Sequence, residues 1–201
     1  DRVKQLTLRW REPEARDYLA KLFVAFVITG VGGLLIDKLG FELPEDVLPV
    51  AVALLVGGVL FVVVEKKIGD RASLAKVTWA IAIAVGFGQL LAAVFPGTSR
   101  SGATILIALL MGLRRIPAIE FTFLLGVPTL LAAGAYKVFK AIRTESVTED
   151  WGQLALATAV SAVTAFVSVR WLLRYIETHT FVAFGWYRIA LGLALLFAIN
   201  S

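Results

Sequence analysis

Nine consecutive residues near the middle of the 201-residue chain combine the groups that bind an anion. Pro96 and Gly97 can end an incoming helix, and the serines and threonines that follow can cap the next one. The first N–H groups and the positive dipole end of that next helix then point at the turn. Arg100 adds a permanent charge and a planar fork that matches two phosphate oxygens. The segment Pro96-Gly97-Thr98-Ser99-Arg100-Ser101-Gly102-Ala103-Thr104 therefore predicts an anion site.

Composition indicates that the bilayer is the solvent of this chain. Hydrophobic residues make up 59% of it, charged residues 17%, and the mean hydropathy is +0.83, against roughly 45–50% and ~25% in soluble domains. Long neutral runs separate clusters of charge, which predicts one integral membrane domain over residues 1–201. The net charge of +5 comes from basic residues that flank apolar runs, so we expect no nucleic-acid binding. With no cysteine and only His179, a thiol nucleophile and a multi-histidine metal site are excluded.

Five apolar runs are long enough to be membrane-crossing helices. They are Leu19–Ile36, Val47–Val64, Ala118–Val138, Trp151–Val169 and Phe181–Ile199. Residues 1–18 are too charged for hydrocarbon and predict a cytoplasmic or interfacial segment. The fold class is thus all-α and polytopic.

Residues 77–113 break this pattern and predict a re-entrant helical hairpin. The neutral run that begins at Val77 ends in the Pro-Gly segment, and the stretch after Arg100 reaches only Leu113. A helix of about ten residues covers only half of the ~30 Å hydrocarbon core. We therefore expect a tip at Pro96–Thr104 near mid-membrane, where broken helices are tolerated only against protein or a wet cavity.

The same hairpin best explains the distribution of charge. If residues 77–113 form the hairpin, four basic residues lie on one side of the membrane: Lys38, Lys137, Lys140 and Arg143. Thirteen other basic residues lie on the opposite side, which the positive-inside rule makes cytoplasmic. Small residues and a Pro-Gly kink would be a sufficient explanation for the serines and threonines of the tip. They do not explain Arg100, because a charge near the bilayer centre costs at least ~2.5–3.5 kcal/mol on insertion scales.

The stretch Gln89–Thr104 resembles the second signature of the bacitracin-resistance type undecaprenyl pyrophosphate phosphatases, whose core is P-G-x-S-R-S-G-A-T. The likeness continues through Met111-Gly112, Glu120–Leu125, Pro128 and Tyr187-Arg188. The resemblance implies an inverted-repeat fold with two re-entrant hairpins. This chain would be the larger C-terminal part of that fold. The implied activity is hydrolysis of undecaprenyl diphosphate, which recycles the lipid carrier of peptidoglycan synthesis in the bacterial inner membrane. A divalent cation, magnesium or calcium, is implied as cofactor.

The resemblance also implies roles for residues of the hairpin. Arg100, Ser99 and Ser101 would be the catalytic residues, with Arg100 holding the diphosphate and stabilising charge on the transferred phosphoryl group. The substrate-binding residues would be Gly97, Thr98, Gly102 and Thr104. Gln89 either points its amide at the same cavity or makes an interhelical hydrogen bond unrelated to ligand.

One departure from the family pattern is large. The upstream signature, E-x-x-x-E followed by P-x-S-S-T-G-H, is absent from these residues, and His179 has no serine-rich turn beside it. We therefore expect an N-terminal part to be missing, the chain alone to show little activity, and the ligands of the cation to be unidentifiable here. Glu120 and Arg188 are further intramembrane charges, for which we favour a structural pair over a place at the site.

Two rival functions follow from the same residues. A transporter or flippase of a phosphorylated polyprenyl lipid would use the anion site without hydrolysis. Lipid phosphatases of the acid-phosphatase type need a histidine after the Ser-Arg element, and no histidine lies between Arg100 and Thr178. The expected partners are the polyprenyl diphosphate and membrane lipids, and the glycine-rich spans would also allow a homo-oligomer.

Overall fold

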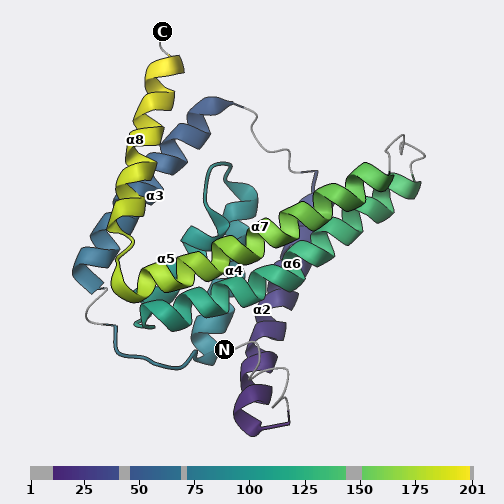
Figure 1. The fold of residues 1–201 in the computed structure, drawn as a ribbon, viewed down its shortest axis with the longest axis horizontal. Helices are drawn as coiled ribbons and strands as arrows, with labels where there is room; N and C mark the ends of the chain where they lie inside the picture. Colours follow the sequence, from purple (N-terminus) through teal and green to yellow (C-terminus); the bar gives the residue numbers. More distant parts are fainter. Residues whose placement is uncertain (1–10, 41–45, 69–71, 144–150, 200–201) are drawn as a thin grey trace.

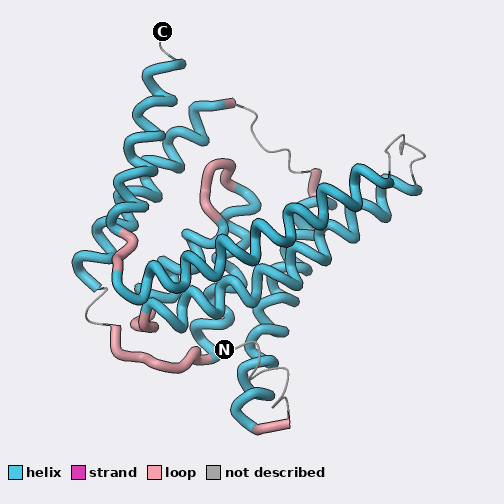
Figure 2. The backbone as a smooth tube through the Cα atoms, in the orientation of Figure 1, coloured by secondary structure: helices cyan, strands magenta, loops and turns pink. Residues whose placement is uncertain are grey.

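A computed structural model of the chain describes residues 11–40, 46–68, 72–143 and 151–199. These ranges are almost entirely helical (Figure 2). Their helices are α2 (Pro13–Lys38), α3 (Val47–Ile68), α4 (Trp79–Val94), α5 (Arg100–Leu110), α6 (Arg115–Arg143), α7 (Trp151–Thr178) and α8 (Val182–Ile199). Helices α2, α3, α6, α7 and α8 are long and apolar enough to cross a membrane, whereas α4 and α5 are shorter. The predicted polytopic fold of five spans and one hairpin is confirmed.

Several helices extend beyond their apolar runs. Helix α2 begins at Pro13, which suits the first helical position, so the last part of the predicted cytoplasmic or interfacial segment 1–18 is helical. Helix α7 continues beyond the predicted run Trp151–Val169 to Thr178, so Arg170 and Arg174 lie on the helix. Such ends can remain helical outside hydrocarbon because a helix satisfies its own backbone groups. Hydropathy thus marked the membrane-crossing part of each helix and missed its polar ends.

The helices form two antiparallel pairs with the hairpin between them (Figure 1). One pair is α3 with α8, and the other is α6 with α7; helix α5 contacts both α3 and α6, while α2 packs against α4. The α3–α8 contact depends on glycine. A Cβ added at Gly58 would lie 2.7 Å from the carbonyl oxygen of Gly185, which is the close backbone approach that small residues permit in membranes.

The hairpin returns to the side on which it enters. The Leu74 amide donates to the Gly112 carbonyl and the Arg114 amide donates to the Leu74 carbonyl, both at 3.0 Å. These bonds place the chain before α4 beside the chain after α5. With 16 and 11 residues, the two helices are about 24 and 17 Å long, and α5 is too short to cross a ~30 Å core.

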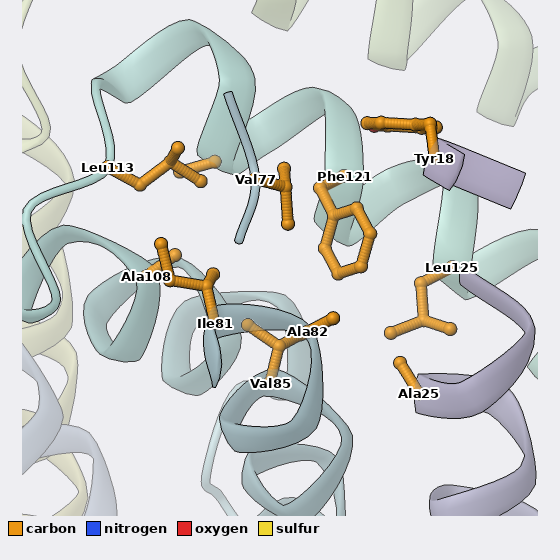
Figure 3. Packing of buried hydrophobic residues seen from close by; sticks show 11 residues of the cluster. Tyr18, Ala25, Val77, Ile81, Ala82, Val85, Ala108, Leu113, Phe121 and Leu125 are labelled. Atoms are coloured by element: carbon orange, nitrogen blue, oxygen red, sulfur yellow. The ribbon is translucent and has the colours of Figure 1, made fainter. Parts of the chain in front are cut away.

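Two apolar clusters fix the hairpin among its neighbours. The first joins α2, α4, α5 and α6 around Phe121, whose ring packs edge-on against Tyr18 (Figure 3). The second joins α3, α5, α6, α7 and the residue before α8, and contains Phe61, Leu109 and Phe181. Both clusters contain residues of α5, so packing on two sides holds this short helix in place.

Candidate anion-binding site

The turn between α4 and α5 consists of residues 95–99 and is the pink loop near the centre of Figure 2. Helix α4 ends at Val94, Pro96 follows two residues later, and Gly97 has a φ of +82°. Only glycine adopts that conformation without strain. The turn also lies directly on α3, since a Cβ at Gly97 would be 2.7 Å from Cα of Val50. Two independent constraints therefore select glycine at position 97.

The second helix of the hairpin begins inside the predicted tip Pro96–Thr104. Ser99, one of the residues predicted to cap it, is the N-cap, and the helix begins at Arg100. The Ser99 hydroxyl accepts a hydrogen bond from the Gly102 amide at 3.1 Å, and its carbonyl accepts one from the Ala103 amide at 2.8 Å. This capping starts the helix at once. Arg100, Ser101, Gly102 and Thr104 therefore lie within the first five residues of α5.

Two backbone donors remain at the start of α5. Among the described residues, no acceptor is bonded to the amides of Arg100 and Ser101. The hydroxyl oxygens of Ser99 and Ser101 lie 3.4 Å apart beside them. Free amides, hydroxyls and the positive end of the helix dipole together favour an anion.

The Arg100 side chain is half-buried and held by one contact. Its Nη2 donates to the carbonyl oxygen of Gly126 on α6 at 3.3 Å, and its other N–H groups have no partner among the described residues. Most of the guanidinium fork is thus available for a phosphate.

Arg188 is also at the turn, the less favoured of its two predicted positions. It lies on α8 with 5% of its surface exposed, and its Nη2 donates to the carbonyl oxygens of Ala53 on α3 and Gly97 in the turn, each at 3.2 Å. The predicted structural pair of Arg188 with Glu120 is therefore wrong. Glu120 precedes Gly126 by six residues, about 9 Å along α6, so it lies away from the depth at which α6 meets Arg100.

The remaining predicted residues are placed as follows. Thr98 is in the turn, where its amide donates to the Phe95 carbonyl at 3.2 Å. The space beside Gly102 is filled by Phe61 and Ser99, because a Cβ there would lie 3.0 Å from each. The Thr104 hydroxyl is buried and donates to the carbonyl oxygens of Arg100 and Ser101, both at 3.0 Å. Ligand contacts by Gly102 and Thr104 stay predictions.

Gln89 is buried among three helices. Its Nε2 donates to the Thr29 hydroxyl on α2 at 3.0 Å, and its Oε1 accepts from the Thr129 hydroxyl on α6 at 3.5 Å. The Thr29 hydroxyl also bonds to the Gly86 carbonyl on α4. The structure thus shows the interhelical hydrogen bond that was one of the two readings of Gln89, while a contact with substrate stays a prediction.

The turn is poorly suited to a divalent metal ion. Magnesium and calcium require several oxygen ligands, usually carboxylates, whereas the side chains at the turn include the guanidinium groups of Arg100 and Arg188. The described residues contain no group of three or more histidine, cysteine, aspartate or glutamate side chains that could hold a metal ion. We therefore derive no chemical step through a metal at this site.

Comparisons with known proteins place this geometry in context. The chain matches the family described as bacitracin resistance protein BacA over residues 2–194. An undecaprenyl-diphosphatase of Rhizobium etli (strain CFN 42) is 50% identical over 197 residues, which cover 97% of this chain and 74% of that protein. The undecaprenyl-diphosphatase of Xanthomonas oryzae pv. oryzae (strain PXO99A) is 48% identical over 187 residues, covering 92% of this chain and 71% of that protein.

Proposed function

Because the chain belongs to the bacitracin resistance protein BacA family, we propose that it hydrolyses undecaprenyl diphosphate to undecaprenyl phosphate and inorganic phosphate. The relatives that carry the name undecaprenyl-diphosphatase support this activity. The reaction returns the lipid carrier to peptidoglycan synthesis. We place the protein in the bacterial inner membrane, with the face that holds thirteen basic residues toward the cytoplasm.

The observation that carries the proposal is the meeting of Arg100 with the free amides at the start of α5. In hydrolysis, water adds to the terminal phosphorus, and the bond from that phosphorus to the bridging oxygen breaks, leaving the lipid phosphate. Charge is spread over the oxygens of the transferred group. The Arg100 fork and the amides of Arg100 and Ser101 can stabilise that charge. The hydroxyls of Ser99 and Ser101 can donate to the same oxygens.

These residues bind and stabilise but do not transfer the proton of water. A guanidinium is always protonated, and a hydroxyl is not a base at neutral pH. Proton transfer is therefore assigned to groups outside the turn. A divalent cation such as magnesium or calcium is part of the proposal, supported by the family resemblance, and removal of divalent cations with EDTA should stop turnover.

Phosphate release from undecaprenyl diphosphate in detergent tests the proposal. We expect the full-length protein to release inorganic phosphate, and Arg100→Ala to remove most of that activity. Arg170→Ala is the matched control, since Arg170 is an exposed arginine on α7. Tight binding of the lipid without phosphate release would instead favour the transporter or flippase.

A further inference from the structure

The Arg188 side chain joins the turn to the α3–α8 pair by hydrogen bonds. Nη2 of Arg188 donates to both the Ala53 carbonyl on α3 and the Gly97 carbonyl in the turn. The two N–H bonds of a single terminal nitrogen thus bridge a membrane-spanning helix and the hairpin tip. Gly57 makes room for this bridge, because a Cβ there would lie 2.7 Å from the same nitrogen.

The peptide that Arg188 holds is fixed at both of its polar ends. Its carbonyl oxygen belongs to Gly97 and accepts from Arg188, and its amide belongs to Thr98 and donates to Phe95. The next residue, Ser99, is the N-cap of α5. The orientation of this one peptide therefore sets the direction in which the free amides of α5 point.

Ordinary packing gives no reason for a charge at position 188. The side chain is 5% exposed, both of its bonded partners are neutral carbonyls, and its buried Nε has no partner among the described residues. A buried charge without a counter-ion is unfavourable in a membrane protein and in general marks a functional position. Methionine would fill a similar volume without that penalty.

We propose that Arg188 is a positioning residue: it holds the Gly97–Thr98 peptide so that the start of α5 and Arg100 are oriented toward the diphosphate. The inference rests on the proposed function. Arg188 need not touch substrate, because it acts through the turn. Loss of this bond should let the turn move and misplace the groups that stabilise the transferred phosphoryl.

The adjacent glycines Gly57 and Gly58 separate positioning from helix packing. An added methyl at Gly57 meets the end of the flexible Arg188 side chain, whereas one at Gly58 meets the Gly185 carbonyl oxygen at 2.7 Å and the Ile189 side chain at 2.8 Å. We expect Gly57→Ala to lower kcat by on the order of 10- to 100-fold, as small displacements of catalytic groups do, with little change in thermal stability. Gly58→Ala should lower thermal stability, because it meets backbone.

Mobility of the turn is measured separately from turnover. The chain has no cysteine, so Thr98→Cys can be labelled selectively with a maleimide in detergent. Arg188→Met and Gly57→Ala, each combined with Thr98→Cys, should label several-fold faster than Thr98→Cys alone. Arg188→Lys, which keeps the charge and one donor group, should recover part of the kcat lost in Arg188→Met.

The outcomes are distinct. If the parent protein releases no phosphate, the proposed function fails, whereas the labelling comparison still reports on the turn. If the parent is active and folded Arg188→Met keeps both its kcat and its labelling rate, the positioning role is overturned. If Arg188→Met does not accumulate in the membrane, Gly57→Ala is the deciding variant, because it leaves the charged Arg188 in place. Unchanged kcat and an unchanged labelling rate in Gly57→Ala would also overturn the inference.

Discussion

The guanidinium of Arg100 rests on the carbonyl oxygen of Gly126, which accepts a hydrogen bond from Nη2 across the α5–α6 contact at 3.3 Å. The bond is long for an N–H donor, for which about 2.9–3.0 Å is usual. A Cβ at Gly126 would lie 3.1 Å from the same nitrogen. Gly126 therefore provides both the acceptor and the space for an arginine that is oriented but weakly held, and such a side chain can turn to a ligand.

Substitution of Arg100 should show whether recognition is bidentate. We expect Arg100→Ala to reduce phosphate release by on the order of 100- to 1,000-fold, the range seen on removal of one donor to a developing anion. Arg100→Lys should recover only a small part, because lysine keeps the charge and loses the planar fork. Thermal unfolding of each variant in detergent serves as the control for folding. A stable Arg100→Lys protein with the parent's turnover would show that only charge matters at this position.

The glycine beneath Arg100 gives a second prediction. Gly126→Ala should push the guanidinium from its resting place and lower phosphate release by roughly tenfold, equivalent to about 1.4 kcal/mol of transition-state stabilisation. Gly134→Ala is the matched control on the same helix, because no atom lies within 4 Å of its added Cβ. Gly134→Ala should leave turnover unchanged and raise helix stability by up to about 1 kcal/mol. Equal activities of the two variants would show that the resting position of Arg100 has no influence on catalysis.

The crossing helices and the hairpin could be predicted from the sequence, because the length of each uncharged stretch decides whether a helix can cross the membrane. The sequence predicts a hairpin over residues 77–113 because the stretch after Arg100 is too short to cross, and it predicts Ser99 as a cap because capping depends on local sequence. The catalytic roles of Ser99 and Arg100 stay predictions. The contacts of Arg188 were not predictable, since its acceptors are backbone carbonyls that every residue carries. The Thr29 and Thr129 partners of Gln89 were hidden for a related reason: they depend on the relative registers of three helices. The polar ends of α6 and α7 were missed because hydropathy does not report a helix outside hydrocarbon.

Cysteine labelling of intact cells tests the orientation derived from charge. Single cysteines at Lys76 and Arg114, which flank the hairpin on one side, should be protected from an impermeant maleimide. A cysteine at Lys38, at the opposite end of α2 from Pro13, should react. The expectation follows from the excess of basic residues on the hairpin's entry side. Reaction at Lys76 and Arg114 with protection at Lys38 would invert the topology, and membrane disruption should make all three positions reactive.

Gln89 is expected to act on stability and not on substrate affinity. Gln89→Leu removes the bonds to Thr29 and Thr129, but both hydroxyls keep a carbonyl acceptor in their own helices, on Ala25 and Leu125. Interhelical hydrogen bonds in membranes contribute about 0.6 kcal/mol on average and at most about 1.7. We therefore expect a modest loss of thermal stability with KM unchanged. A double-mutant cycle with Thr29→Val should return a coupling of that size. A raised KM in a fully stable Gln89→Leu protein would instead assign the amide to the substrate.

The two constraints on Gly97 can be separated with a second glycine of the hairpin. Gly97 and Gly112 have φ values of +82° and +86°, so alanine at either position is strained by about 1–2 kcal/mol. Only at Gly97 does the new methyl also meet backbone, 2.7 Å from Cα and 2.8 Å from the carbonyl oxygen of Val50, whereas at Gly112 the nearest atom is in the Leu74 side chain at 3.8 Å.

Gly112→Ala should thus lower thermal stability moderately and leave phosphate release close to the parent's, because it lies at the far end of α5. Gly97→Ala should lower stability further and abolish most phosphate release, since the turn must move off α3 and away from Arg188. Thermal unfolding and phosphate release measured on both variants decide the matter, and equal losses in the two would mean that the contact with Val50 constrains neither the turn nor the site.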